Sequence, residues 1–231
     1  MTGISEISKN IEVNGVSKRY PGRHVNALVD VNLKIAPGKL VAILGPSGCG
    51  KSTLLNLLGG IDSPSEGSIA IGEAKLSDMS DDQLTEFRLK ELGFVFQFFN
   101  LLPTFTVEEN VSLPLEMAGR DPGAVRESVA SLLDRVGLAE RSGFMPSQLS
   151  GGEMQRTAVA RAIVHKPRLV LADEPTGNLD TENGAIVLDL LRQINIESGI
   201  TIIMATHSLE AAAKADLVIK MRDGKVVDQE S

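Results

Sequence analysis

The run GPSGCGKS at residues 45–52 constrains the fold more than any other feature of this chain, because of what stands on either side of it. Before it comes LVAIL at residues 40–44, a continuous apolar run typical of a strand buried on both faces. After it comes STLLNLLGG, which favours a helix. The run itself contains the complete pattern G-x-x-x-x-G-K-[ST], whose glycines let successive backbone N–H groups point inward at a phosphate. Strand, glycine-rich loop and helix together predict a phosphate-binding loop.

Each part of the loop has an expected role. Lys51 places a positive charge on the β- and γ-phosphates of a nucleotide, and the Ser52 hydroxyl binds Mg²⁺. The positive end of the following helix adds to the attraction. Cys49 is either a reactive thiol or simply a small side chain, and we favour the second interpretation. A glycine-rich turn that merely precedes Lys-Ser is the plain alternative, and the flanking strand and helix argue against it. The predicted nucleotide-binding residues of the loop are Gly45, Pro46, Ser47, Gly48, Cys49, Gly50, Lys51, Ser52 and Thr53.

Two later apolar runs also end in polar residues. LVLA precedes Asp173-Glu174, and ITIIMA precedes Thr206-His207. Because the carboxyl ends of parallel strands meet at one edge of a sheet, we expect Asp173 at the Mg²⁺ position beside Ser52. Glu174 is then the candidate to polarise the attacking water, with His207 touching the γ-phosphate or orienting Glu174. The alternative for Asp173 and Glu174 is a solvated strand end, and the alternative for His207 is a structural histidine. The phosphate loop upstream favours the catalytic interpretation of all three residues.

The rest of the chain divides by its periodicity. Alternating apolar residues between Val29 and Ile35 predict a half-buried strand, and Asp223-Gly224 between two short runs predicts a hairpin. From Thr106 to Lys166 helical periodicity dominates, with Ser150 as a helix N-cap, and Asp81 is a start signal for an earlier helix. We therefore expect one α/β domain over residues 1–231, with the P-loop NTPase fold that the phosphate loop indicates. Its mainly parallel core sheet is covered by helices, with an N-terminal antiparallel β region. Residues 1–96 and 167–231 form the core, and residues 97–166 form an inserted helical sub-domain.

Composition limits the function classes. With 42% hydrophobic and 23% charged residues the chain is an ordinary globular one. A net charge of −7 and the absence of Trp argue against nucleic-acid binding. The single cysteine excludes an intramolecular disulfide and favours a cytoplasmic setting. We find neither a signal peptide nor an apolar run long enough to span a bilayer, so any membrane association requires a partner.

The segment Leu149-Ser-Gly-Gly-Glu153, followed by a basic helix, resembles the LSGGQ signature of ABC-transporter ATPases. The order of motifs also matches: phosphate loop, Gln97, signature, Asp173-Glu174, Asn178-Leu-Asp180 and His207. The resemblance covers essentially the whole chain. It implies an ATPase that uses ATP and Mg²⁺ and dimerises head to tail on ATP, so that the signature of one subunit covers the ATP of the other.

The resemblance also implies individual roles. Tyr20 stacks on adenine, Gln97 reaches the Mg²⁺ and the water, and Asp180 communicates across the dimer. The signature residues expected to act on the partner's ATP are Ser150, Gly151, Gly152 and Glu153. Glu153 is a departure, since the family most often has Gln there, and it affects the expected strength of dimer closure.

Within the family, the runs around Leu58, Phe96 and Asp173 look most like the branch that includes LolD, MacB and FtsE. A membrane-transporter subunit, for export or lipoprotein release, is the function this implies. An FtsE-like subunit that drives a membrane complex without transport is the alternative. A DNA-repair or ribosomal ABC ATPase would need a long heptad insertion or two fused units, and a GTPase would need a guanine-recognition motif; the sequence contains none of these.

The phenylalanines near Gln97 suggest where a membrane subunit docks. Alternating Phe94, Phe96 and Phe98 are expected to be core. Side chains that break this alternation are expected to line a groove for a short helix of an integral membrane subunit, within residues 97–105; they are Phe99, Leu101, Leu102 and Phe105. The expected location is the cytoplasmic face of the membrane.

Overall fold

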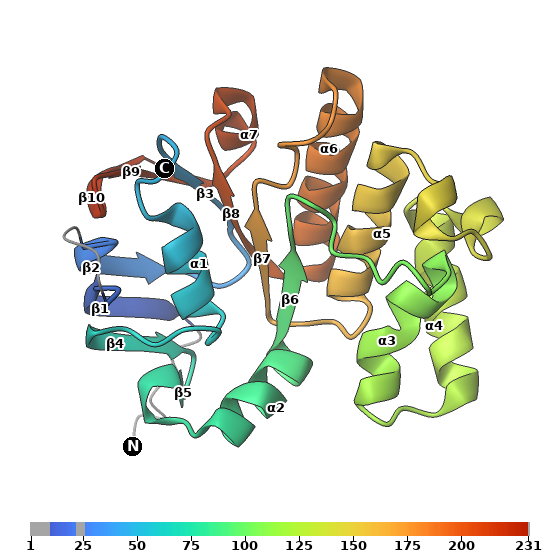
Figure 1. Ribbon diagram of the computed structural model, residues 1–231, viewed down its shortest axis with the longest axis horizontal. Coiled ribbons are helices and arrows are strands. Elements are labelled where there is room, and N and C mark those ends of the chain that lie inside the picture. The colour runs from blue at the N-terminus through green and yellow to red at the C-terminus, as the bar shows by residue number, and fades with distance from the viewer. Residues whose placement is uncertain (1–9, 22–25, 231) are drawn as a thin grey trace, which may run out of the picture.

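The computed structural model describes residues 10–21 and 26–230, which contain two β-sheets (Figure 1). The larger sheet has six strands in the order β10-β9-β3-β8-β7-β6. Neighbouring strands from β9 to β6 run parallel, and β10 pairs antiparallel at the edge. The bounds are β3 Leu40–Leu44, β6 Leu92–Val95, β7 Leu169–Asp173, β8 Thr201–Thr206, β9 Leu217–Arg222 and β10 Lys225–Glu230. The mainly parallel core sheet predicted from the sequence is confirmed.

The three apolar runs form adjacent central strands, because each is buried on both faces. Val41 of β3, Leu171 of β7 and Ile203 of β8 face one hydrophobic cluster, together with helix α1 (Lys51–Leu58). Ala42 and Ile202, one residue along, face the other cluster with α6 (Thr181–Ser198). Because side chains alternate along a strand, continuous apolar runs are what a sheet covered on both sides requires.

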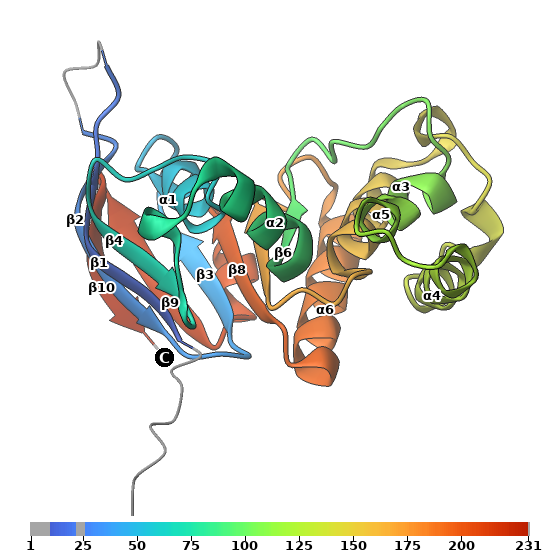
Figure 2. The ribbon, with the colours of Figure 1, turned by 90° about the horizontal axis from the view of Figure 1, so that it is seen from below.

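The second sheet is antiparallel, with four strands in the order β2-β1-β4-β5. Its bounds are β1 Ile11–Lys18, β2 Leu28–Ile35, β4 Glu66–Ile71 and β5 Ala74–Lys75. The predicted alternation in β2 is confirmed, with Val31, Leu33 and Ile35 buried and the residues between them exposed. The sheet lies at one end of the molecule, beside the β9–β10 hairpin (Figure 2). Asp223 and Gly224 form the predicted turn of that hairpin, both with positive φ, as a tight right-twisted hairpin needs.

The remaining helices begin where side chains cap them. Helix α2 (Asp81–Glu91) begins at Asp81, the predicted start signal, but its N-cap is the preceding Ser80, in a capping box with Gln83. Ser150 caps α5 (Gly151–Ile163), as predicted. The short α7 (Leu209–Ala213) follows β8. None of the helices in the described parts of the chain has both the length and the apolar character needed to cross a membrane.

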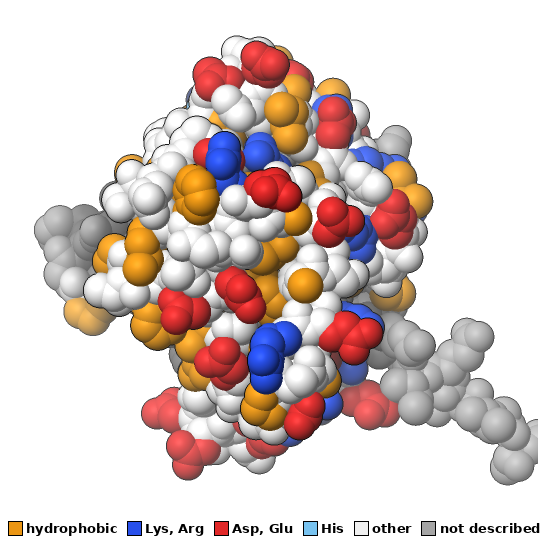
Figure 3. Space-filling view, turned by 90° about the vertical axis from the view of Figure 1, so that its right-hand side faces the viewer, with side chains coloured by type: hydrophobic (Ala, Val, Ile, Leu, Met, Phe, Trp, Pro, Cys, Tyr) orange, Lys and Arg blue, Asp and Glu red, His pale blue; other side chains and the backbone are white. Residues whose placement is uncertain are grey.

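The predicted helical segment is an insertion between β6 and β7. It consists of α3 (Val107–Met117), α4 (Pro122–Arg135), α5 and two 3₁₀ turns, η2 (Ala139–Arg141) and η3 (Pro146–Gln148). A third 3₁₀ turn, η1 (Leu76–Asp78), precedes α2. The insertion lies at the opposite end of the molecule from the antiparallel sheet (Figures 1 and 2). Its outer face carries acidic and basic side chains interspersed with hydrophobic ones (Figure 3). The division of the chain at about residues 97 and 166 stays a prediction.

The contact between β6 and α5 leaves no room for a side chain at Gly93. A Cβ placed there would lie 2.0 Å from the backbone oxygen of Ala162. We expect Gly93→Ala to lower the free energy of unfolding by roughly 3 kcal/mol, because strand and helix would have to separate. Urea denaturation measures this change. Gly143→Ala is the matched control, since a Cβ there meets nothing within 4 Å, and equal losses in both variants would contradict the prediction.

Candidate functional site

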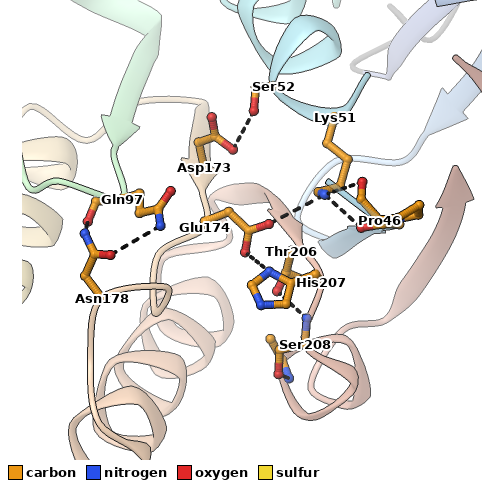
Figure 4. A network of polar contacts seen from close by, with 12 residues as sticks. Pro46, Lys51, Ser52, Gln97, Asp173, Glu174, Asn178, Thr206, His207 and Ser208 are labelled. Atoms are coloured by element: carbon orange, nitrogen blue, oxygen red, sulfur yellow. Dashed lines mark hydrogen bonds and ion pairs between the residues drawn. The ribbon is translucent and has the colours of Figure 1, made fainter. Parts of the chain in front are cut away.

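The carboxyl ends of β3, β6, β7 and β8 lie at one edge of the core sheet, because these strands are parallel. The phosphate loop follows β3, Asp173 and Glu174 lie at the end of β7, and His207 follows β8. The segment after β6 carries Gln97. Figure 4 shows these side chains gathered at that edge, although they are far apart in the sequence.

The phosphate loop has the conformation its glycines permit. Gly48 and Gly50 have φ angles of 78° and 106°, which other residues rarely adopt. Helix α1 has no side-chain cap and no acidic residue in its first turn, whereas each of the other α-helices in the described residues has a capping side chain. Its first N–H groups can therefore bind an anion.

Lys51 is positioned inside the loop. Its side chain is only 5% exposed, and its Nζ donates to the backbone oxygens of Gly45 at 2.8 Å and Pro46 at 3.2 Å. The same ammonium lies 3.6 Å from a carboxylate oxygen of Glu174 (Figure 4). The loop thus holds a buried positive charge beside the acid that follows β7.

Ser52 and Asp173 meet as predicted. The Ser52 hydroxyl donates to Asp173 Oδ1 at 3.1 Å, joining the start of α1 to the end of β7. Burial raises the pKa of Asp173, and the hydrogen bond from Ser52 opposes this effect. Within the described residues, no three acidic, histidine or cysteine side chains group closely enough to hold a metal by themselves.

Glu174 is held in a strained conformation between two basic side chains. Its φ of 45° lies in the left-handed region, where a non-glycine residue persists only if its surroundings impose it. A backbone hydrogen bond from Glu174 N to Ala205 O fixes it to β8. One carboxylate oxygen lies near Lys51, and the other lies 2.9 Å from Nδ1 of His207 (Figure 4). The structure therefore brings the three predicted catalytic residues together.

Gln97 is close to this group but points elsewhere. Its amide nitrogen donates to Asn178 Oδ1 at 3.3 Å, and the Asn178 amide donates to the Gln97 backbone oxygen at 2.9 Å. Asn178 belongs to the motif that ends at Asp180, and no role was predicted for it. Gln155 was not singled out at all: it is fully buried on α5 and donates to the backbone oxygen of Pro175 at 2.7 Å. The available signal was a long polar side chain among the buried positions of α5, most of which are small or apolar.

The signature lies away from the phosphate loop of its own chain, since α5 and α1 lie on opposite sides of β6 and β7 in both ribbon views (Figures 1 and 2). Ser150 accepts a hydrogen bond from Glu153 N at 3.3 Å. Asp180 is the N-cap of α6, and hydrogen bonds from Asn183 lower its pKa. A Cβ on Gly152 would lie 2.2 Å from Asn183 Oδ1, so the signature and the Asp180 cap are in contact through Asn183.

Tyr20 lies between β1 and β2, in a segment whose residues 22–25 are outside the described part of the chain. Its hydroxyl donates to Asp62 at 3.0 Å, and Lys18 Nζ lies 4.9 Å from the centre of its ring. The stacking of Tyr20 on adenine stays a prediction.

The prediction that Phe94, Phe96 and Phe98 belong to the core is partly wrong. The rings of Phe94 and Phe96 stack with their centres 5.8 Å apart, but Phe98 is 72% exposed because the strand ends at Val95. Phe99 and Asn100 then turn with positive φ, and their backbone oxygens accept from Arg161 of α5. The Phe99 ring is near Gly151. Phe98, predicted as core, is therefore exposed, and Phe99 packs toward the signature.

Comparison with known proteins places this geometry in a family. The family model for ABC transporters matches residues 28–177. The chain belongs to the ABC transporter family. An uncharacterized ABC transporter ATP-binding protein of Methanocaldococcus jannaschii is 48% identical over 94% of this chain and 98% of its own length. The lipoprotein-releasing system ATP-binding protein LolD of Shewanella oneidensis is 42% identical over 96% of this chain and 97% of its own.

A solved ABC structure has the same fold. It is described as the dimeric, post-hydrolysis state of the ATP-binding cassette MJ0796 bound to ADP and phosphate. It is 40% identical to this chain, with a TM-score of 0.88 over 96% of this chain and 98% of its own. The P-loop NTPase fold and the assignment as an ATP-hydrolysing subunit of an ABC transporter, both predicted from the sequence, are confirmed.

Proposed function

We propose that two copies of this ABC subunit close head to tail around two ATP molecules, and that hydrolysis drives an integral membrane partner at the cytoplasmic face of the membrane. The observation that carries the proposal is Glu174, held in a strained conformation between Lys51 and His207 at the edge where the phosphate loop lies. A carboxylate so placed can accept a proton from water while the buried ammonium compensates its charge.

Within each site, water attacks the γ-phosphorus in line, the bond to the bridging oxygen of ADP breaks, and phosphate leaves. The N–H groups of the loop and the Lys51 ammonium stabilise the charge that develops on the phosphate oxygens. Glu174 orients the water and takes its proton, and His207 holds the Glu174 carboxylate through the Nδ1 contact. His207 is a positioning residue for Glu174 or a direct contact of the γ-phosphate.

Mg²⁺ fits the donors at the end of β7. Hard oxygen ligands suit this ion, which keeps several waters and uses few carboxylates together with substrate phosphates. The Ser52 hydroxyl and the Asp173 carboxylate, already 3.1 Å apart, supply two such ligands. Gln97 joins them if its side chain turns away from Asn178. The ion would screen the phosphate charges.

The head-to-tail arrangement is supported by the position of the signature. Ser150 and the start of α5 are a second helix N-terminus, whose dipole favours negative charge, and they lie away from the phosphate loop of their own chain. A second copy can place that site over the ATP. The similar cassette MJ0796 is described as a dimer. Asp180 accepts hydrogen bonds from Asn183, the residue next to Gly152 of the signature, which suits it to communicate across such a dimer.

Coupling to the membrane partner is supported by exposed apolar side chains next to Gln97. Phe98 is 72% exposed and Leu102 is 38% exposed, on the segment between β6 and α3. We propose that this segment, residues 97–105, accepts a short cytoplasmic helix of the partner. The likeness to LolD favours transport over the FtsE-like alternative. Co-purification of the tagged protein from detergent-solubilised membranes with ATP, followed by mass spectrometry, tests this: recovery of a multi-span protein supports it, and recovery of soluble proteins alone contradicts it.

The docking surface can be tested by one substitution. Leu102→Asp places a charge on the proposed apolar contact, so we expect at least a tenfold loss of the co-purified membrane protein with ATP affinity unchanged. Ile196→Asp on α6, where the side chain is 67% exposed and remote from Gln97, is the matched control. Equal recovery with the two variants, or a parallel loss of ATP affinity in Leu102→Asp, would contradict the assignment.

A further inference from the structure

The signature contains an acid where the proposed dimer brings a phosphate. Glu153 is in the first turn of α5, three residues after Ser150. Hydrogen bonds from the Ser150 backbone and the Arg141 side chain lower the pKa of Glu153 to about 2, so its carboxylate is ionised at any physiological pH. A negative charge beside the γ-phosphate of a partner's ATP would oppose closure. The chain must therefore compensate it.

Both oxygens of this carboxylate have donors within the chain. Glu153 Oε2 accepts from Ser150 N at 2.8 Å, which completes a capping box. Glu153 Oε1 accepts from Nε of Arg141 at 3.0 Å. The Arg141 guanidinium also lies 4.8 Å from the centre of the Phe144 ring, which limits its freedom. Because Ser150 Oγ is an acceptor in the cap, its hydrogen can be donated to a phosphate oxygen.

The Arg141–Glu153 pair has little to contribute to fold stability. The two side chains are 44% and 20% exposed, and exposed ion pairs typically add about 0–1 kcal/mol. The pair can still change how strongly the signature attracts or repels an approaching anion, because Arg141 cancels the charge of Glu153. With Arg141 in place the signature presents a neutral pair and a helix N-terminus, and without it the helix N-terminus carries an uncompensated carboxylate.

We propose that Arg141 is a positioning residue of the ATPase cycle: it neutralises Glu153 and holds it in the helix cap, so that Ser150 and the start of α5 can accept the γ-phosphate of ATP bound to the partner chain. The proposal rests on the head-to-tail dimer proposed above. Arg141 acts through Glu153 and touches neither ATP nor the reacting atoms. Glu153, the departure from the usual Gln, is the reason that an arginine is needed here.

A double-mutant cycle in the Glu174→Gln background tests this. The four proteins are the parent, Arg141→Ala, Glu153→Gln and the double variant, and the measured quantity is the ATP concentration for half-maximal dimerisation, by light scattering after size exclusion. We expect Arg141→Ala to raise this concentration about tenfold, since a lone carboxylate then faces the phosphate. In the Glu153→Gln background the same substitution should change it less than twofold. Arg141→Lys keeps the charge and should stay within about threefold of the parent.

Two further readouts separate this role from a structural one. Binding of a fluorescent ATP analogue to the monomer should be the same in all four proteins, because the nucleotide binds the phosphate loop of its own chain. The melting temperature should change little, because ion pairs of this exposure contribute little to stability. An equal effect of Arg141→Ala in both backgrounds, or no effect in either, would overturn the role of Arg141 while the dimer stands. A parent that stays monomeric at saturating ATP and Mg²⁺ would overturn the proposed dimer itself, and this inference with it.

Discussion

Glu174→Gln is expected to bind ATP, to hydrolyse it at least about 100-fold more slowly than the wild type, and to accumulate as a dimer. The amide keeps the size of the side chain but cannot accept a proton from water, and a positioned base contributes roughly 10²–10⁴-fold. The loop, Lys51 and the signature are unchanged, so ATP remains bound between the subunits. Phosphate release measures the rate, and light scattering measures the dimer.

Glu127→Gln is the control for this prediction, since it makes the same chemical change on an exposed side chain of α4. It should hydrolyse ATP at the wild-type rate. Hydrolysis by Glu174→Gln at more than a tenth of the wild-type rate would show that another group activates the water. A monomeric Glu174→Gln protein at saturating ATP and Mg²⁺ would count against the dimer while leaving the assignment of Glu174 intact.

Lys51→Ala is expected to lose both ATP binding and hydrolysis. The ammonium is the buried positive charge of the phosphate loop, and loss of one such group typically costs about 10²–10³-fold in rate. Without it the backbone oxygens of Gly45 and Pro46 also lose their donor, and Glu174 loses its nearby cation. We expect ATP affinity to fall at least about tenfold, since an interaction with the bound ground state is removed as well.

Lys75→Ala removes a lysine with an exposed side chain from β5 and should change neither quantity. Binding is measured by calorimetry and hydrolysis by phosphate release. The contrast between Lys51→Ala and Glu174→Gln is the informative result, because Glu174→Gln should bind ATP and Lys51→Ala should not. If Lys51→Ala binds ATP as tightly as the wild type, the loop N–H groups alone hold the phosphates and the proposed role of Lys51 is wrong.

The core strands and the helix caps can be compared with what the local sequence patterns predict. The local patterns were sufficient for the core strands, since continuous apolar runs such as LVAIL occur where both faces of a sheet are covered. They were also sufficient for the Ser150 cap, because Ser150 satisfies a backbone N–H group within its own turn, whereas α2 is capped by Ser80, one residue before the predicted signal. Phe98 shows where the pattern fails: apolar alternation continues past Val95, but hydrogen bonding in β6 ends there, and the side chain is exposed.

The sequence by itself determined the phosphate loop, the order of the motifs along the chain and the family, because each motif is a short run of consecutive residues. Only the tertiary structure decided the strain at Glu174, the contact of Gln97 with Asn178, and the Arg141–Glu153 pair. Each of these joins segments that meet through packing, so no local pattern of apolar and polar residues specifies them. Glu174 adopts its unfavourable φ because β8, Lys51 and His207 hold it from three directions, and that constraint exists only in the folded chain.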